Sequence, residues 1–159
     1  KFCVVVELAK FGTWKSVIQN DQNSNFITIA HRITAAKQIA DAMVFLESEH
    51  VVHADLACRN VLCFDMGKDD HTRVKVKLSD FGLSVQLDSV PKCVDHEFPS
   101  LWILSDDASS NCKKQARPIR WCSPETVLEN KLSHCSDVWS LGATLWESFG
   151  AGENPWFMQ

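Results

Sequence analysis

One helical pattern constrains the fold more than any other part of the sequence. Between Thr28 and Glu49, apolar residues recur at steps of three and four positions, and the charged residues mostly stand elsewhere. This spacing places the apolar side chains on one face of an α-helix, so we predict a helix over this range that packs against a core. The apolar positions are Ile29, Ile33, Ala36, Ala40, Met43 and Leu46.

A second helical pattern begins near Ser136 and continues to Gly150. Its apolar residues, which we predict to be core positions, are Val138, Leu141, Leu145 and Trp146. Residues 84–117 have no such periodicity, and an irregular segment of this length in a compact domain is usually functional or disordered.

Short apolar runs predict several small strands. Residues 2–6 (FCVVV) are typical of a buried strand, which a turn near Gly12 would follow. Three further strand-like runs occupy Val51–Val52, Val61–Cys63 and Val74–Leu78. The polar stretch between the last two predicts the loop of a β-hairpin.

The bulk composition is that of one soluble globular domain: 159 residues, 45% of them hydrophobic, with a net charge of −4. That charge argues against nucleic acid or an anionic membrane as a partner, and no apolar run is long enough to span a bilayer. Seven cysteines without regular spacing indicate reduced thiols and a cytoplasmic location for this domain, whether the parent protein is soluble or a receptor. Because the chain starts inside an apolar run, we interpret it as a fragment.

Four polar motifs follow one another along the chain: HADLACRN at 53–60, SDFG at 79–82, PIRWCSPE at 118–125 and SDVWSLG at 136–142. Protein kinases carry H-R-D-L-x-x-x-N, D-F-G and A-P-E in the same order. This chain therefore resembles the large lobe of a protein kinase, in the tyrosine-kinase branch, over essentially its whole length.

The resemblance implies an α+β fold: a kinase-like large lobe, mainly α-helical with short β-hairpins. Residues 1–12 would be the last small-lobe strand and the hinge, and residues 13–159 would be the large lobe, truncated before its final helices. Nearly all of the small lobe would lie outside the chain.

The resemblance also implies phosphoryl transfer from ATP with Mg²⁺ as cofactor. Such catalysis needs a positioned nucleophile and neutralised phosphate charge. Asp55 would orient the substrate hydroxyl, and Asn60 and Asp80 would bind the metal through hard oxygen atoms. His53 and Phe81, next to Gly82, would stack on one another.

Two further stretches favour tyrosine in protein substrates as the acceptor. Arg59 would lie beside the acceptor ring, and Pro118, Ile119, Arg120 and Trp121 would form the loop that seats it. For the adenine of ATP, the resemblance implies Val6 as gatekeeper, backbone contacts from Glu7 and Ala9, and packing by Leu62. Asp137 would anchor the catalytic-loop backbone, and Glu125 would pair with an arginine from the missing part of the lobe.

Two departures from the family pattern bear on regulation. Ala54 replaces an arginine that commonly pairs with a phosphorylated residue of the activation segment. The chain also contains no tyrosine. We therefore expect a parent protein that is not switched by phosphotyrosine in this segment, which another contact, such as packing of Trp102, would hold. A serine site within residues 84–117 stays open.

Other functions remain as alternatives. Ala54 favours a pseudokinase that acts as a nucleotide-binding or regulatory module, although Asp55, Asn60 and Asp80 are intact. A serine/threonine kinase or a truncated, nonfunctional product are further possibilities. His50 and His53 would point to opposite faces of a strand, which argues against a zinc pair. Cys58 is the one cysteine to test for reactivity, and we expect the isolated fragment to be inactive and weakly stable.

Overall fold

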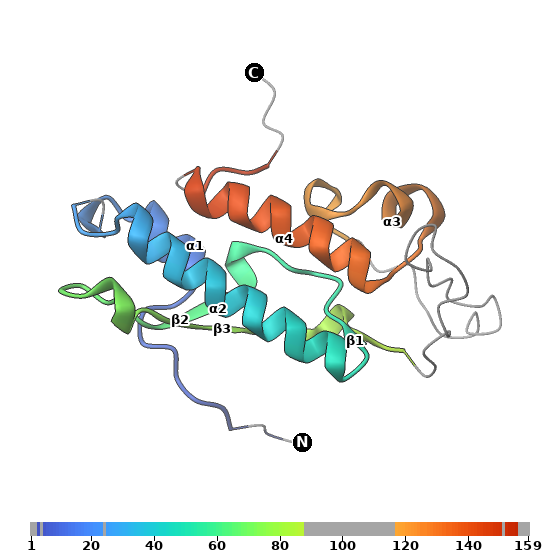
Figure 1. The fold of residues 1–159 in the computed structure, drawn as a ribbon, viewed down its shortest axis with the longest axis horizontal. Coiled ribbons are helices and arrows are strands. Elements are labelled where there is room, and N and C mark those ends of the chain that lie inside the picture. The colour runs from blue at the N-terminus through green and yellow to red at the C-terminus, as the bar shows by residue number, and fades with distance from the viewer. Residues whose placement is uncertain (1–2, 4, 24, 88–116, 151, 156–159) are drawn as a thin grey trace.

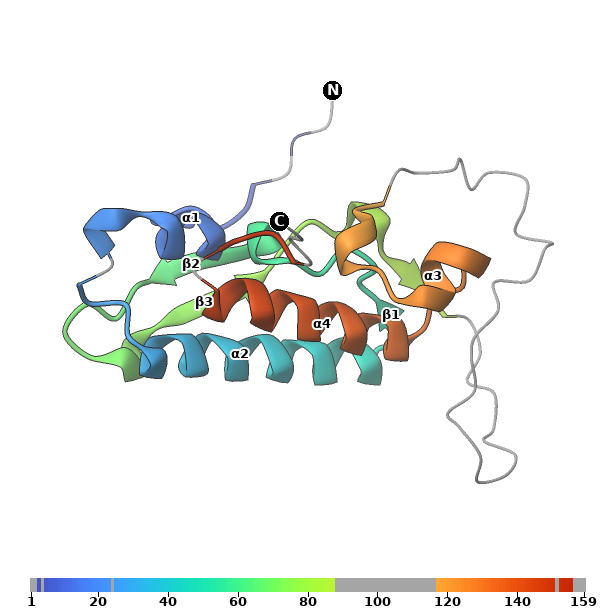
Figure 2. The same cartoon turned by 90° about the horizontal axis from the view of Figure 1, so that it is seen from above.

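The computed structural model describes residues 3, 5–23, 25–87, 117–150 and 152–155. Two long helices, α2 (Ile29–Ser48) and α4 (His134–Phe149), lie side by side and run in opposite directions (Figures 1 and 2). α2 begins directly after Thr28, whose backbone N–H donates to Nδ1 of His31 at 3.2 Å. Both helices occupy the ranges that the sequence predicts.

The strands form two antiparallel pairs. β2 (Val61–Asp65) pairs with β3 (Lys75–Leu78), and β1 (Val51–Val52) pairs with β4 (Val85–Gln86). The predicted strands at Val51–Val52, Val61–Cys63 and Val74–Leu78 and the hairpin between the last two are confirmed. β4 falls within the stretch predicted to be irregular, because two residues carry no recognisable strand pattern.

Two short helices were missed by the sequence patterns: α1 (Trp14–Gln19) and α3 (Pro124–Glu129). Six residues are fewer than two helical turns, so no periodicity develops. Short 3₁₀ turns complete the described chain at Asp21–Asn23, Cys58–Asn60, His71–Arg73, Phe81–Leu83 and Ile119–Trp121. In outline the fold is a mixture of helices and small two-stranded sheets, as expected.

The main core lies where α1, α2 and the β2–β3 hairpin meet. Trp14 is fully buried in it, and its indole Nε1 donates to Oγ of Ser148 in α4 at 2.9 Å. Its other members are Val17, Ile18, Ile27, Ala35, Ile39, Leu56, Cys58, Val61, Cys63, Val74 and Val76. This core therefore fixes the start of β2, where the HADLACRN motif of residues 53–60 ends.

The predicted strand at residues 2–6 is wrong for the positions that the structure describes. Val5 is 96% exposed and Val6 78% exposed, and no described strand lies beside them to accept their hydrogen bonds. The chain reaches the sheet only later, where Thr13 forms a bridge with Leu62 of β2. Trp102, the expected anchor of the activation segment, lies outside the described residues.

The predicted core faces of the two long helices are also partly wrong. Val138 and Trp146 of α4 are 62% and 46% exposed, and Ile29 and Ile33 of α2 are exposed as well. The buried residues of α4 are instead small or polar: Ser136, Asp137, Ser140, Ala143, Thr144, Glu147 and Ser148. Two of them, Asp137 and Glu147, accept backbone N–H groups of the loop at residues 53–60, which apolar side chains could not do.

No helix among the described residues combines the length and the apolar character that crossing a bilayer requires.

Candidate active site

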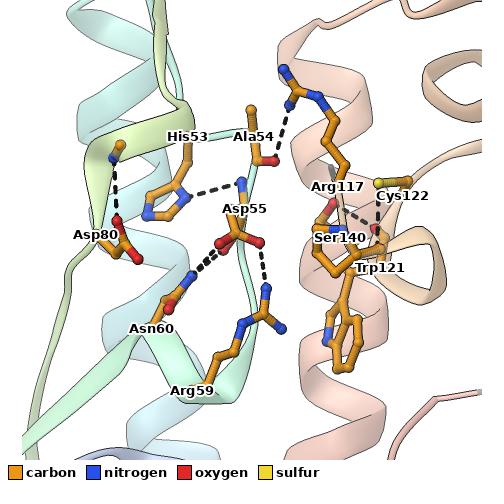
Figure 3. A network of polar contacts seen from close by, with 12 residues as sticks. His53, Ala54, Asp55, Arg59, Asn60, Asp80, Arg117, Trp121, Cys122 and Ser140 are labelled. Atoms are coloured by element: carbon orange, nitrogen blue, oxygen red, sulfur yellow. Dashed lines mark hydrogen bonds and ion pairs between the residues drawn. The ribbon is translucent and has the colours of Figure 1, made fainter. Parts of the chain in front are cut away.

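The motif at residues 53–60 forms a loop between β1 and β2 in which two side chains converge on one carboxylate. Arg59 forms an ion pair with Oδ1 of Asp55, and Nδ2 of Asn60 donates to Oδ2 of Asp55 at 2.7 Å (Figure 3). The same Asn60 nitrogen also lies 2.7 Å from the backbone oxygen of Asp55. The half-buried Asp55 is therefore fixed in orientation.

Asp137 in the first turn of α4 holds the backbone of this loop. Its carboxylate accepts hydrogen bonds from the backbone N–H of His53 at 2.6 Å and of Ala54 at 2.9 Å. Burial raises the pKa of Asp137, although both hydrogen bonds and the nearby His53 oppose the rise. The residue immediately before Asp55 is thereby fastened to the longest helix of the C-terminal part.

The His53 side chain connects the catalytic loop to the SDFG motif. Its Nε2 lies 3.1 Å from the carbonyl oxygen of Ser79, and Nδ1 accepts the backbone N–H of Asp55 at 3.3 Å. The rings of His53 and Phe81 are 5.0 Å apart between centroids and tilted by 52°. The expected contact between these two rings is present.

Asp80 lies beside the catalytic loop because the preceding residue is bonded to it. The backbone N–H and the hydroxyl of Ser79 both donate to the backbone oxygen of Asn60, each at 2.9 Å. Asp80 itself has a left-handed backbone, with φ of 63°, and its carboxylate accepts the N–H of Gly82 at 3.3 Å. The SDFG motif is thus attached directly to Asn60, the last residue of the HADLACRN loop.

The donor set of Asn60 and Asp80 fits Mg²⁺. Both hydrogen bonds from the Asn60 side chain use its nitrogen, so its oxygen is the atom that would bind a cation. Mg²⁺ is usually held by one or two protein oxygens together with substrate phosphates and water. The described residues contain no group of three or more His, Cys, Asp or Glu placed to hold a metal.

Trp121 connects Arg59 to α4. The Arg59 guanidinium carbon lies 4.9 Å from the centroid of the Trp121 ring, and the indole Nε1 donates to Oε2 of Glu147 at 3.2 Å. Ser140 donates to the backbone oxygen of Trp121 at 2.7 Å (Figure 3). A guanidinium over an indole face is an attractive arrangement, so this ring holds Arg59 beside Asp55.

The other residues of the predicted acceptor loop immediately precede Trp121 in the chain. Pro118 precedes the 3₁₀ turn and accepts the backbone N–H of Trp121 at 3.0 Å. Ile119 is 70% exposed, and Arg120 donates to the backbone oxygen of Pro155 at 3.0 Å. Glu125 follows in the first turn of α3, where it is half-buried.

Glu147 and Lys15 are part of this site, and sequence reasoning missed them. Glu147 is fully buried, its Oε2 accepts the backbone N–H of Cys58 at 2.9 Å, and its Oε1 lies 2.9 Å from Nζ of Lys15. The sequence did contain one signal for Glu147. This carboxylate stands seven positions after Ser140 and three after Thr144, which places it on the small-residue face of α4.

Cys58 does not have the surroundings of a reactive thiol. Burial, reinforced by the adjacent Glu147 carboxylate, raises its pKa far above the ordinary value. Its Sγ donates to the backbone oxygen of Thr144 at 3.4 Å. A nucleophilic cysteine needs a lowered pKa, so Cys58 is a structural residue.

The predicted adenine contacts are only partly assembled around β2. Leu62 is half-buried in β2, and Gly12 accepts the backbone N–H of the next residue, Cys63, at 2.8 Å. Ala9 accepts the N–H of Gly12 at 3.2 Å, which brings this segment to the strand. Val6 is exposed, whereas Glu7 forms an ion pair with Lys77 that lowers the pKa of Glu7.

Comparison with known proteins assigns the chain to a family. Residues 1–158 match the family described as protein tyrosine and serine/threonine kinase. The chain is 34% identical, over 96% of its length, to the tyrosine-protein kinase sid-3 of Caenorhabditis elegans. It is 38% identical, over 82% of its length, to the high affinity nerve growth factor receptor of Gallus gallus.

These matches cover 11% and 14% of the two relatives, so the chain spans about a tenth of the length of such proteins. A third relative, the tyrosine-protein kinase Shark of Drosophila melanogaster, is 36% identical over 96% of the chain. The loop around Asp55, the SDFG motif bonded to it and these relatives agree: the chain belongs to the protein kinase superfamily, in its tyrosine-kinase branch.

Proposed function

We propose that the protein containing this chain transfers the γ-phosphate of ATP to tyrosine hydroxyl groups of protein substrates, with Mg²⁺ as cofactor. The observation that carries this proposal is the loop in which Arg59 and Asn60 both bond the Asp55 carboxylate. In this proposal residues 13–159 form the large lobe, and residues 1–12 form the hinge and the end of the small lobe. The consumption of ATP fits a cytoplasmic kinase domain.

Asp55 is the proposed catalytic residue. Its carboxylate would accept a hydrogen bond from the tyrosine hydroxyl and direct the oxygen toward the γ-phosphate. Asn60 and Asp80 would hold Mg²⁺, which, when bound, neutralises negative charge on the phosphates. Because Arg59 and Asn60 restrain Asp55 before substrate arrives, little reorganisation is needed during the reaction.

Binding of the two substrates is assigned to separate groups. Arg59 and the loop of Pro118, Ile119, Arg120 and Trp121 would seat the tyrosine ring. Leu62 and the backbone of Glu7 and Ala9 would contact adenine, with Val6 as gatekeeper. His53, Phe81, Gly82, Glu125 and Asp137 support these groups without touching substrate.

The test is phosphate transfer by the full-length protein, offered one peptide with a single tyrosine and a matched peptide with serine, in the presence of Mg²⁺ and ATP. The Asp55→Asn variant keeps the shape of the side chain and removes its charge, and Asp41→Asn on the exposed side of α2 is the control. We expect transfer to tyrosine that Asp55→Asn abolishes and Asp41→Asn retains.

Other outcomes identify the alternatives. Transfer to serine alone would replace the tyrosine assignment with a serine/threonine kinase. Nucleotide binding that depends on Mg²⁺, without transfer to either peptide, would overturn the enzyme proposal in favour of a regulatory pseudokinase. Ala54, which departs from the family motif, is the residue that favours the pseudokinase alternative.

A further inference from the structure

The two ends of the segment that follows the SDFG motif meet at Ala54 and the apolar cluster around it. The methyl group of Ala54 belongs to an apolar cluster with Val52 and Leu132. The outgoing chain packs against this cluster through Leu83, Val85 and Leu87. At the returning end, Nη1 of Arg117 donates to the backbone oxygen of Ala54 at 3.3 Å (Figure 3).

Ala54 adopts a backbone conformation that needs such restraint. Its φ is 62°, in the left-handed region, which costs an L-residue about 1 kcal/mol or more and persists only where surrounding contacts enforce it. Asp137 holds the N–H of Ala54 at 2.9 Å, and Arg117 holds its oxygen. The two bonds fix both sides of the residue that immediately precedes Asp55.

Arg117 also acts on the same electrostatic environment as Asp55. Cys122 lies near both residues, and burial raises the pKa of its thiol. Arg117 opposes that rise and Asp55 adds to it. The guanidinium is therefore close enough to influence the site without bonding the catalytic carboxylate itself.

We propose that Arg117 is a positioning residue for Asp55, and that it fastens the returning end of the segment to the catalytic loop through the Ala54 carbonyl. This inference rests on the proposed kinase function and adds how its catalytic loop is held. A backbone carbonyl is present in every state of the protein, so this contact requires no phosphate on the intervening residues. The family pattern has an arginine at position 54 of the loop. Here the arginine is Arg117 of the segment, and the loop contributes the apolar side chain of Ala54.

The experiment compares the full-length protein with its Arg117→Met and Arg117→Lys variants. Methionine retains much of the side-chain length without any donor, whereas lysine retains a cation and a donor. Arg73→Met, an exposed arginine at the far end of the β2–β3 hairpin, is the matched control. The readouts are kcat and KM for a tyrosine peptide, the melting temperature, and amide hydrogen exchange across residues 53–57.

We expect Arg117→Met to lower kcat about tenfold, since misplaced catalytic groups reduce rate steeply, with a smaller change in KM for ATP. Exchange at residues 53–57 becomes faster, Arg117→Lys recovers part of the rate, and Arg73→Met matches the wild type. Phosphatase treatment leaves wild-type kcat unchanged. If Arg117→Met melts at a much lower temperature, its low kcat could reflect lost stability. The kcat of Arg117→Lys and the hydrogen exchange at residues 53–57 then distinguish lost stability from lost positioning.

Two results would overturn the inference: wild-type kcat together with wild-type exchange in Arg117→Met, or phosphatase treatment that abolishes activity. Hydrogen exchange needs no catalysis, so it separates this inference from the proposed function. Faster exchange in Arg117→Met, in a protein that phosphorylates neither peptide, would support the positioning contact and overturn only the proposed phosphate transfer.

Discussion

Lys15 and Glu147 form an ion pair that joins α1 to α4, with 2.9 Å between Nζ and Oε1. The Glu147 side chain is fully buried, and that of Lys15 is 24% exposed. The second carboxylate oxygen accepts hydrogen bonds from Cys58 and Trp121. This pair therefore supports the catalytic loop and the ring beneath Arg59 at the same time.

Replacing Lys15 with methionine leaves the buried Glu147 carboxylate without its cation, so we expect a loss of about 3 kcal/mol in the free energy of unfolding. The double variant Lys15→Met/Glu147→Gln recovers part of this loss, because a neutral amide needs no counter-charge. Urea unfolding of the full-length protein measures both values. Lys37→Met, on the exposed side of α2, is the control and shifts stability by about 0.5 kcal/mol at most. A double variant no more stable than Lys15→Met would contradict the expected coupling.

Restoring the arginine of the family motif at position 54 is expected to harm this protein. In Ala54→Arg, a guanidinium enters the apolar cluster of Val52 and Leu132 and approaches Arg117. Burial of an unpaired charge should lower the free energy of unfolding by about 2–4 kcal/mol. Ala54→Met provides the control for side-chain bulk in the same unfolding experiment. An arginine variant at least as stable as the methionine variant would show that the cluster accommodates the charge.

The sequence predicted α2 because about five turns of apolar periodicity lie within one continuous segment. It predicted the range of α4 but only part of its buried face: Leu141 packs against the main core, as predicted. The periodicity of Val138 and Trp146 follows the exposed side, whereas the buried side is selected by Asp137 and Glu147, which serve distant backbone N–H groups. Partners so far apart in the chain leave no local pattern.

The candidate site likewise contains residues that sequence motifs predict and contacts that they do not. Asp55, Asn60 and Asp80 belong to short motifs whose spacing is visible in the sequence, and the structure brings their loops together through Ser79. The contact of Arg117 with Ala54 joins residues 63 positions apart. It depends on a left-handed backbone and on an apolar cluster, neither of which a motif encodes.

The cysteines should differ sharply in their reaction with iodoacetamide. Burial raises the pKa of Cys58 strongly and that of Cys63 to about 12, so both remain protonated at pH 8 and are shielded from the reagent, whereas Cys135 is exposed. In native protein at pH 8, we expect alkylation of Cys135 and protection of Cys58 and Cys63. Mass spectrometry of digested protein gives the site of each adduct, and urea-unfolded protein is the control in which all three react. Rapid modification of native Cys58 would contradict the structure around it.

Asp137→Asn tests the anchor of the catalytic loop. An asparagine offers one oxygen where His53 and Ala54 need two acceptors, so we expect a loss of about 2–3 kcal/mol in the free energy of unfolding. The control is Asp41→Asn, which removes an exposed carboxylate from α2.

The difference in the free energy of unfolding between wild type and Asp137→Asn should also depend on pH. Burial raises the pKa of Asp137 in the folded protein above its ordinary value of 3.8. At a pH between the ordinary pKa and the raised pKa, the folded protein therefore binds a proton that the unfolded chain has released. The stabilisation from this group is therefore fully present below the ordinary value and is lost as the pH rises through the folded value. Urea unfolding between about pH 4 and pH 7 should show the wild-type margin over Asp137→Asn shrinking as the pH rises. A margin that grows with pH would mean that the two backbone hydrogen bonds outweigh burial, and that the carboxylate is held in its charged form.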